Sequence, residues 1–543
     1  MIALLLLQLA QDPLAVRADT IRQGHDALHY DITVVVENGT DHIVGEVETT
    51  WLLGSDRPVE VALDSAIRVV RVSMNGRENT RLTRTRWGRP SGLILIPHQG
   101  RAGDTISTRI RYHGTPPDGL IIGKNAYGAP TFFADNWPDR AHRWFPAQDL
   151  PGDKATVAFH VQAPLEYQVV ANGVLGKIDT LAYGNAVWHY RMDRPIPVYT
   201  MVVGVARMVR TALPDGGCRI TCVPVSVWTY PEDTAYAVTG PFRRAAGMVD
   251  YFSDLIGPFP YASLAHVESS TRFGGMENSS AIFYDEKAYE ARRLSEETVA
   301  HETAHQWFGN AVTEADWHHL WLSEGFATYL ATLWIGHADG DSAFAAVMRR
   351  HAQAIFAAAG PSEGGANRSP VTGRPILDPT VTDLLSLLNS NNYQKGAWVL
   401  HQLRGLVGDS TFVRGLRRYY ETRRDGTALS ADFARIMTET SGQDLDWYFR
   451  QALTQPGYPI LEVRWKYRGK NRLALDIRQT QPGEWGSYRI PGLELLVDGT
   501  PVRVDVDGVE TRQVVKGITR APRAVQVNPT GWWLLQATVL PDE

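Results

Sequence analysis

Apolar and polar positions alternate differently in three successive stretches of the chain. Over residues 29–208, short runs such as 30–36 alternate apolar and polar residues with a period of two, and turn residues separate the runs. This is the pattern of strands with one buried face, so the stretch predicts an all-β domain. Helical periodicity takes over near Asp233 and persists to about Ala452, and strands return after a double-proline segment at 455–459.

The elements within these stretches define the domain organisation. Helices are predicted over 297–308, 320–335, 343–358 and 394–406, and the last strands over 461–467, 472–478, 493–497 and 502–506. We therefore expect a multidomain α+β protein. Its parts are an N-terminal β domain over 21–211, a mainly helical domain over 212–453 and a C-terminal β sandwich over 454–543.

An apolar run at 2–10 opens the chain. It is too short to span a bilayer but has the length of a signal-peptide core, although it lacks the usual basic lead-in. We predict a signal segment over 1–20 and a periplasmic or secreted protein, with a cytoplasmic chain as the alternative. No other stretch is long and apolar enough to cross a membrane, so no stable membrane span is expected.

Composition and cysteine content narrow the function classes. The 543 residues are 44% hydrophobic and carry a net charge of -5. A negative net charge gives no indication of nucleic-acid binding, which relies on clustered positive charge. If Cys218 and Cys222 lie on one strand, as the local alternation suggests, their α-carbons are roughly 13 Å apart and too distant for a disulfide. Cysteine usage then leaves the redox compartment open.

The strongest chemical signal lies in the helical stretch, at His301, Glu302 and His305. Two histidines four positions apart share one face of a helix and can bind a single cation, and Glu302 lies one step round from them. Glu324, further along, supplies a third ligand. Two imidazoles and one carboxylate leave a fourth tetrahedral position open, as in hydrolytic zinc sites. We expect one Zn²⁺ per chain and a reaction that uses water.

The alternative interpretation of this motif is a pair of solvated histidines, with Glu302 in a weak surface ion pair. Apolar residues surround most of the helix, namely Val299, Ala300, Ala304, Trp307 and Phe308. The polar side chains would then be partly buried, and buried polar groups need partners. The sequence therefore favours the metal site.

Further motifs occur at distances that match a known family. Residues 273–278 read Phe-Gly-Gly-Met-Glu-Asn and residues 393–396 read Tyr-Gln-Lys-Gly, on either side of the metal motif. Segments 136–140, 144–149, 306–310 and 455–459 agree as well. In order and spacing the chain resembles the zinc aminopeptidases of the aminopeptidase N type, which are gluzincins of peptidase family M1. The resemblance is strongest from about 130 to 460.

The resemblance implies a β saddle, a thermolysin-like, mainly helical catalytic domain and a β sandwich. It also implies a substrate-binding strand formed by Gly274, Gly275, Met276, Glu277 and Asn278. In the family, the glutamate at the position of Glu277 holds the free α-amino group of the peptide, and the backbone at Gly274 and Gly275 lies beside the scissile carbonyl. A buried carboxylate paired with an ammonium makes a charge-assisted hydrogen bond that a blocked terminus cannot make.

Two catalytic groups follow from the same resemblance. Glu302 would take a proton from the attacking water and pass it to the leaving amine. Tyr393 would donate a hydrogen bond to the oxyanion that forms at the carbonyl. The implied function is hydrolysis of the N-terminal residue from peptides with a free N-terminus. The alternatives are an ordinary strand-end carboxylate for Glu277 and an aromatic residue at a helix start for Tyr393.

Some positions depart from the family pattern. Ser323 stands where relatives often have Asn and His319 where many have Asp, so the contacts that orient the ligands are expected to differ. The branch that also hydrolyses a lipid epoxide has an aspartate where this chain has Leu385, which weakens the alternative of an epoxide or ester hydrolase. A catalytically silent binding protein is the alternative from another class, but every ligand and the base are present.

Length is a further departure. The sequence stops after the predicted sandwich and lacks the long helical C-terminal domain of most relatives. From this we expect an open cleft and a monomer. The preferred N-terminal side chain is not predicted, because a pocket is shaped by residues that are scattered along the chain.

Overall fold

The computed structural model describes residues 12–15, 24–78, 83–86, 91–214, 222–358 and 371–541. Contacts divide the chain into two compact units. The first, here called the N-terminal unit, comprises 17–338 and 416–429. The second, the C-terminal unit, comprises 1–16, 339–415 and 430–543.

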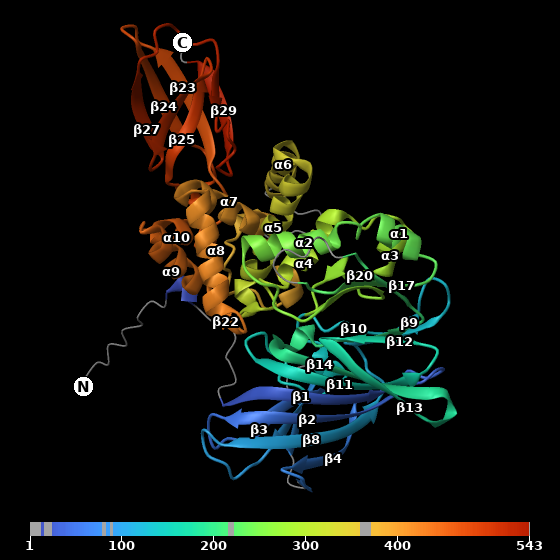
Figure 1. Ribbon diagram of the computed structural model, residues 1–543. Helices are drawn as coiled ribbons and strands as arrows, with labels where there is room; N and C mark the ends of the chain where they lie inside the picture. Colours follow the sequence, from blue (N-terminus) through green and yellow to red (C-terminus); the bar gives the residue numbers. More distant parts are fainter. Residues whose placement is uncertain are drawn as a thin grey trace, which may run out of the picture. The chain divides into compact units, whose positions relative to one another are not determined.

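An eight-stranded sheet dominates the β region of the N-terminal unit, in the order β13-β14-β11-β1-β2-β8-β4-β5. At its centre β1 (His25–Val35) pairs in parallel with β11 (Lys154–Pro164) and antiparallel with β2 (Ile43–Leu53), as Figure 1 shows. The remaining strands are β4 (Arg68–Met74), β5 (Arg77–Glu78), β8 (Thr105–Gly114), β13 (Val174–Thr180) and β14 (Asn185–Pro197). Every second residue of β11 is buried, which is the alternation predicted from the sequence.

Two smaller sheets complete the β region. One has the order β3 (Val59–Asp64), β7 (Ser91–Ile96), β6 (Thr83–Arg86), and the other β12 (Gln168–Ala171), β15 (Val203–Ala206), β10 (Pro130–Ala134), β9 (Leu120–Lys124). The chain leaving β10 carries the segment 135–149, and backbone hydrogen bonds between Ala62 and Ala147 tie its end to β3.

A five-stranded sheet with helices forms the rest of the N-terminal unit. Its order is β16 (Val209–Ala212), β17 (Val225–Thr229), β18 (Leu264–Ser269), β20 (Ala281–Asp285), β19 (Gly275–Met276). The helices are α1 (Thr234–Thr239), α2 (Ala245–Leu255), α3 (Glu286–Glu290), α4 (Glu296–His305) and α5 (Trp321–Asp339). Helix α4 contacts both α2 and the edge strand β19, and β21 (Val312–Glu314) pairs with β22 (Gly426–Ala428).

Local sequence sets the ends of α4. Ser295 caps its start by accepting a hydrogen bond from the Thr298 amide, and Glu296 and Glu297 lie in the first turn, where carboxylates stabilise the helix dipole. After His305 the chain turns at Gly309, whose φ of +119° suits glycine. A β-carbon there would also lie 2.5 Å from Ser323 Oγ. The helix therefore ends where its second histidine can meet α5.

The C-terminal unit combines helices with two sheets. Its long helices are α6 (Asp341–Ala357), α7 (Gly396–Val407), α9 (Ser430–Ser441) and α10 (Asp446–Thr454). Its short helices are η6 (Val371–Gly373), η7 (Leu384–Leu387) and η8 (Asn391–Lys395). Helix α8 (Asp409–Arg423) has residues in both units. One sheet has the order β27 (Glu510–Lys516), β24 (Arg472–Gln479), β23 (Ile460–Tyr467), β29 (Gln536–Pro541). The other has the order β26 (Thr500–Val506), β25 (Ile490–Val497), β28 (Val525–Val527), and Figure 1 shows both. The predicted fold class, with β-rich ends and a helical middle, is confirmed.

One expectation about the cysteines is wrong. Cys222 takes part in a disulfide and lies before β17, outside any strand, so the extended geometry that placed the two cysteines roughly 13 Å apart does not hold. Cys218 lies outside the described residues. Among the described helices, none combines the length and the apolar character needed to cross a bilayer.

Candidate active site

Three side chains from α4 and α5 converge on one point. The Nε2 atoms of His301 and His305 are 3.0 Å apart, and Glu324 Oε2 lies 3.1 Å from the first and 3.2 Å from the second. Tetrahedral zinc with bonds of about 2.0–2.2 Å requires ligand atoms roughly 3.3 Å apart. The donor set and its spacing therefore fit one zinc ion. The two helices bring together the residues that the sequence motif predicted.

Other contacts orient the two imidazoles. The Nδ1 atom of His305 lies 3.2 Å from the carbonyl of Phe308 and 3.1 Å from the hydroxyl of Ser323. The Nδ1 atom of His301 faces the Thr328 hydroxyl at 3.5 Å. Each ring thus directs Nε2 toward the shared point, and such outer contacts fix the tautomer of a ligating histidine. Ser323 is one of these partners.

Glu302 lies beside the triad and against the edge strand β19. Its side chain is buried, and a β-carbon on Gly275 would come within 2.2 Å of Glu302 Oε1. Only glycine allows the strand to approach the carboxylate so closely. Oxygen atoms of Glu277 and Glu302 and a ring nitrogen of His305 all lie within 4.8 Å of one another. The proposed base and the proposed amine anchor therefore border the same small space.

Two amides hold the backbone of Glu277 against the end of α4. Its carbonyl accepts hydrogen bonds from Gln306 Nε2 at 3.0 Å and from Asn310 Nδ2 at 2.6 Å. Both donor side chains are completely buried, and the backbone N–H of Asn310 donates to the carbonyl of His305 at 3.1 Å. The anchor and the metal ligands therefore belong to one hydrogen-bonded framework.

Lys154, the first residue of β11, extends this framework into the β region. Its ammonium donates to the carbonyls of Asn310 at 2.8 Å, Ala311 at 2.9 Å and Gly426 at 3.2 Å. All three donors of the ammonium are thus used. Burial lowers the pKa of Lys154 to about 7. Sequence reasoning does not find this residue, because no local pattern relates a lysine at the start of a strand to a loop more than 150 positions away.

The pocket has an acidic character. Burial raises the pKa of Glu277 to about 7, with His305 opposing the shift and Glu324 reinforcing it. Burial also raises the pKa of Glu302 well above its usual range. Burial would raise the pKa of Glu324 too, but the two histidines outweigh it and hold that pKa low. Carboxylates gathered without enough nearby cations favour a site that receives positive charge.

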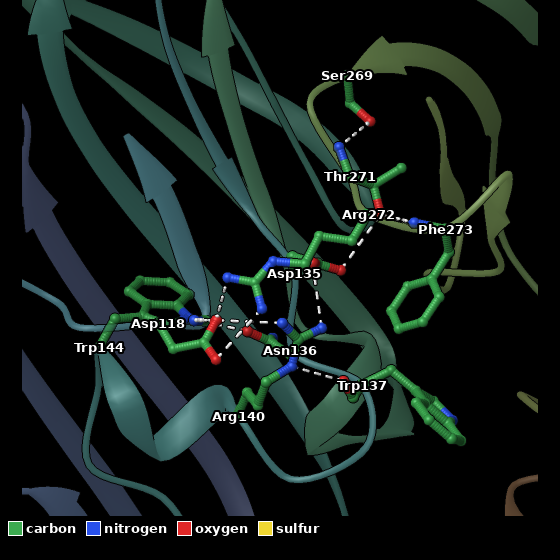
Figure 2. Close-up of polar contacts among 11 residues, drawn as sticks. Asp118, Asp135, Asn136, Trp137, Arg140, Trp144, Ser269, Thr271, Arg272 and Phe273 are labelled. Atoms are coloured by element: carbon green, nitrogen blue, oxygen red, sulfur yellow. Dashed lines mark hydrogen bonds and ion pairs between the residues drawn. The ribbon is translucent and has the colours of Figure 1, made fainter. Parts of the chain in front are cut away.

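An ion-pair network supports the segment that precedes β19, and Figure 2 shows its residues. Asp118 accepts from Arg140 at 3.1 Å and from Arg272 at 2.8 Å. Arg140 also pairs with the fully buried Asp135 at 3.1 Å, and Asp135 accepts from the Thr271 hydroxyl at 3.2 Å. The network joins the segment after β10 to the segment before β19.

Aromatic rings lie along the edge of this network. Trp137 meets Phe273 edge-to-face at 5.8 Å and Trp317 at 5.4 Å, and Trp317 meets Tyr199 at 5.1 Å. The Arg140 side chain donates to the Trp137 carbonyl and lies over the Phe273 ring, so it holds both rings (Figure 2). Tyr199 interacts with the Glu277 carboxylate. We call these four rings the aromatic wall; it connects Phe273, which precedes Gly274, with the amine anchor.

The remaining predicted residues are placed as follows. Met276 ends β19, and Asn278 is completely buried just beyond Glu277. Gly274 stands directly before the strand. Tyr393 lies on η8 of the C-terminal unit, and its role toward the triad remains a prediction. Leu385 lies on η7 with 55% of its surface exposed.

A largely buried His-His-Glu set, a carboxylate beside it and an acidic residue directly after a neighbouring strand are typical of a metal-dependent hydrolase site. Residues 244–451 match the model of the peptidase family M1 domain. Aminopeptidase N of Streptomyces lividans is 28% identical over 68% of this chain and 45% of its own length. Glutamyl aminopeptidase of Bos taurus is 26% identical over 63% of this chain and 36% of its own.

Solved structures give the same answer. The M1 zinc metallopeptidase of Deinococcus radiodurans is 26% identical with a TM-score of 0.67, covering 80% of this chain and 95% of that one. A mutant of it bound to a Tyr-Ser-Ala substrate is 25% identical with a TM-score of 0.66, covering 80% and 94%. Residues 244–451 are thus similar to the domain of peptidase family M1, and the likeness to M1 zinc metallopeptidases implies one catalytic zinc, for which His301, His305 and Glu324 are the candidate ligands. The chain spans less than half the length of the two curated relatives named above.

Proposed function

We propose that this protein is a zinc-dependent aminopeptidase that removes the N-terminal residue from peptides. The observation that carries the proposal is the position of Glu277, a buried carboxylate within 4.8 Å of Glu302 and His305. In a peptide the α-nitrogen and the carbonyl carbon of the same residue are roughly 2.5 Å apart, and the next carbonyl is more than 3 Å further on. An ammonium held by Glu277 therefore brings only the first peptide bond to the triad.

The residues of the site divide the chemistry among them. His301, His305 and Glu324 would hold the zinc, which when bound supplies a Lewis acid that activates water and polarises a carbonyl. Glu302, buried beside them, accepts a proton from the attacking water and returns it to the leaving amine. Burial raises its pKa, which suits a carboxylate that accepts a proton and later releases it.

Tyr393 is assigned the oxyanion contact. Its phenol would donate a hydrogen bond to the carbonyl oxygen as negative charge develops there, which lowers the barrier more than it strengthens binding of the substrate. The match to the family M1 domain supports this role, since residues 393–396 lie within the matched segment.

The aromatic wall supports a preference for large apolar N-terminal side chains. Phe273 and Trp137 contact each other directly before the substrate-binding strand, so an aromatic side chain beside Glu277 finds apolar surface and edge-to-face partners. The related structure from Deinococcus radiodurans was solved with a Tyr-Ser-Ala peptide. We propose that this chain takes similar peptides.

One experiment tests the whole proposal. A panel of aminoacyl p-nitroanilides, each with a free and an N-acetylated amino group, should show hydrolysis of the free forms only, fastest for Tyr, Trp and Leu. Glu277→Ala should raise KM and lower kcat together, because the anchor also positions the bond. Glu290→Ala, an exposed glutamate of α3, is the matched control and should behave as the wild type. Rapid internal cleavage of blocked peptides would show an endopeptidase instead.

A periplasmic or secreted location and a monomeric state complete the proposal. The disulfide at Cys222 supports the location, because disulfides persist in oxidising compartments. N-terminal sequencing of protein from its native host should find a start near residue 20, and thiol labelling without reductant should leave Cys222 unmodified. Two reactive thiols in protein recovered from the cytosol would contradict this location. Light scattering should report the mass of one chain.

A further inference from the structure

A small, partly open cavity lies in the C-terminal unit, between η8, α7, α10 and the start of the sandwich. Its volume is about 40 Å³, and its lining includes Lys395, Trp398, Tyr458, Tyr488 and Trp533. A buried water needs about 10–15 Å³ of such space, so the cavity has room for a few waters or one larger ion. Its contents therefore depend on the polar groups that face it.

Lys395 brings a buried positive charge to this cavity. The residue is only 5% exposed. Within the described residues its ammonium has one polar contact, 3.5 Å from the carbonyl of Gln455, which is long for a hydrogen bond. No carboxylate in the described part of the chain forms an ion pair with it. Burial lowers the pKa of Lys395 to about 7, and no neighbouring charge contributes to that shift. A buried cation without a counter-ion is costly.

A second unsatisfied donor lines the same space. The indole N–H of Trp398 is buried and has no hydrogen-bond partner among the described residues. Several other polar side chains of the lining are occupied elsewhere. Gln451 exchanges hydrogen bonds with the backbone of Arg489, Tyr488 donates to the carbonyl of Pro456 and Tyr458 donates to the side chain of Gln536. Within the described lining, the side-chain groups left without good partners are therefore donors.

We infer that this cavity binds a small inorganic anion, with chloride as the natural occupant. Water carries as many donors as acceptors, so waters placed between Lys395 and Trp398 would have hydrogens left to satisfy. Chloride only accepts hydrogen bonds, and its charge neutralises the ammonium in the place where burial makes that charge costly. The chemistry of the lining therefore selects an anion over neutral solvent.

The anion would act on the reaction through η8. Lys395 follows Tyr393 by two residues on the same π-helical turn. This consequence rests on the proposed function, in which Tyr393 contacts the oxyanion. An occupied cavity fixes the Lys395 side chain and hence the turn that carries the phenol. Chloride should therefore raise kcat by roughly fivefold, the lower end of the usual range of coupling between two sites, with little change in KM.

Bromide and chloride binding to the whole protein provide the test, and neither readout needs activity. Crystals soaked in sodium bromide should show an anomalous peak in the cavity, within about 3.5 Å of Lys395 Nζ and Trp398 Nε1. At pH 6.5, replacing 150 mM sodium gluconate with sodium chloride should raise the unfolding midpoint by roughly 2 °C. Gluconate is a bulky organic anion, unlike the small halides, and it keeps the ionic strength constant.

Two variants and one control decide the outcome. Lys395→Met should abolish the bromide peak and the chloride-dependent shift of the midpoint, whereas Lys516→Met, which removes an exposed lysine of β27, should retain both. Trp398→Phe removes only the orphaned donor and should weaken the chloride response even if Lys395→Met fails to fold. Waters alone in the cavity at 0.5 M bromide, or a peak that persists in Lys395→Met, would overturn the inference.

The two proposals fail separately. Bromide in the cavity of a protein that hydrolyses none of the aminoacyl anilides would leave the anion site standing and remove the aminopeptidase. If the anilides are hydrolysed with the same kcat in chloride and gluconate and no bromide enters the cavity, the aminopeptidase stands and the anion site is removed.

Discussion

Replacing Glu302 with Gln should lower kcat by three or more orders of magnitude and leave the zinc content at one ion per chain. The amide keeps the volume of the side chain but cannot accept the proton of the attacking water, and general-base assistance together with correct orientation of the water is worth at least this much. Stopped-time hydrolysis of Leu-p-nitroanilide gives the rate, and plasma emission spectrometry gives the metal content.

The control for this variant is Glu290→Gln, which changes an exposed carboxylate of α3 and should leave both measurements unchanged. Loss of zinc from Glu302→Gln would indicate that Glu302 is a ligand, which contradicts the geometry of the triad. An unchanged rate would remove Glu302 from the chemistry altogether.

Tyr393→Phe should lower kcat by roughly a hundredfold and change KM little. A hydrogen bond to developing oxyanion charge is made mainly in the transition state, so its loss appears in kcat, and one such donor is typically worth a factor of about 10² to 10³. Steady-state kinetics with a Tyr-initiated tripeptide provide both constants. Tyr467→Phe, a hydroxyl loss on β23 of the same unit, is the matched control. A change confined to KM would mean that Tyr393 only binds the substrate.

The metal centre was predictable because its chemistry is local. His301, Glu302 and His305 share one helix, and both the spacing and the apolar neighbours can be counted along the sequence. Glu324 required only that a second helix follow closely. The structure then places the three ligand atoms 3.0–3.2 Å apart, as the motif implied.

The supporting framework was not predictable, because it depends on contacts between distant segments. Gln306 and Asn310 lie in a motif that the family shares, but only the fold shows that both bind the carbonyl of Glu277. Trp137 and Phe273 are 136 positions apart, and a network of ion pairs brings them together. The sequence around Cys222 alternates like a strand, but the residue lies in the connection between β16 and β17, so its disulfide was not predictable from that alternation.

The ammonium of Lys154 shows that the β region is part of the structure that supports α4, the helix with the two histidines, and cannot be removed from it. A protein shortened to the helical domain would lose the only side chain that donates to the Asn310, Ala311 and Gly426 carbonyls together, among the residues described. Each buried acceptor left without its donor costs about 1–3 kcal/mol. Natural variants at this strand start should therefore be interpreted as active-site variants, although they lie far from the zinc motif in the sequence.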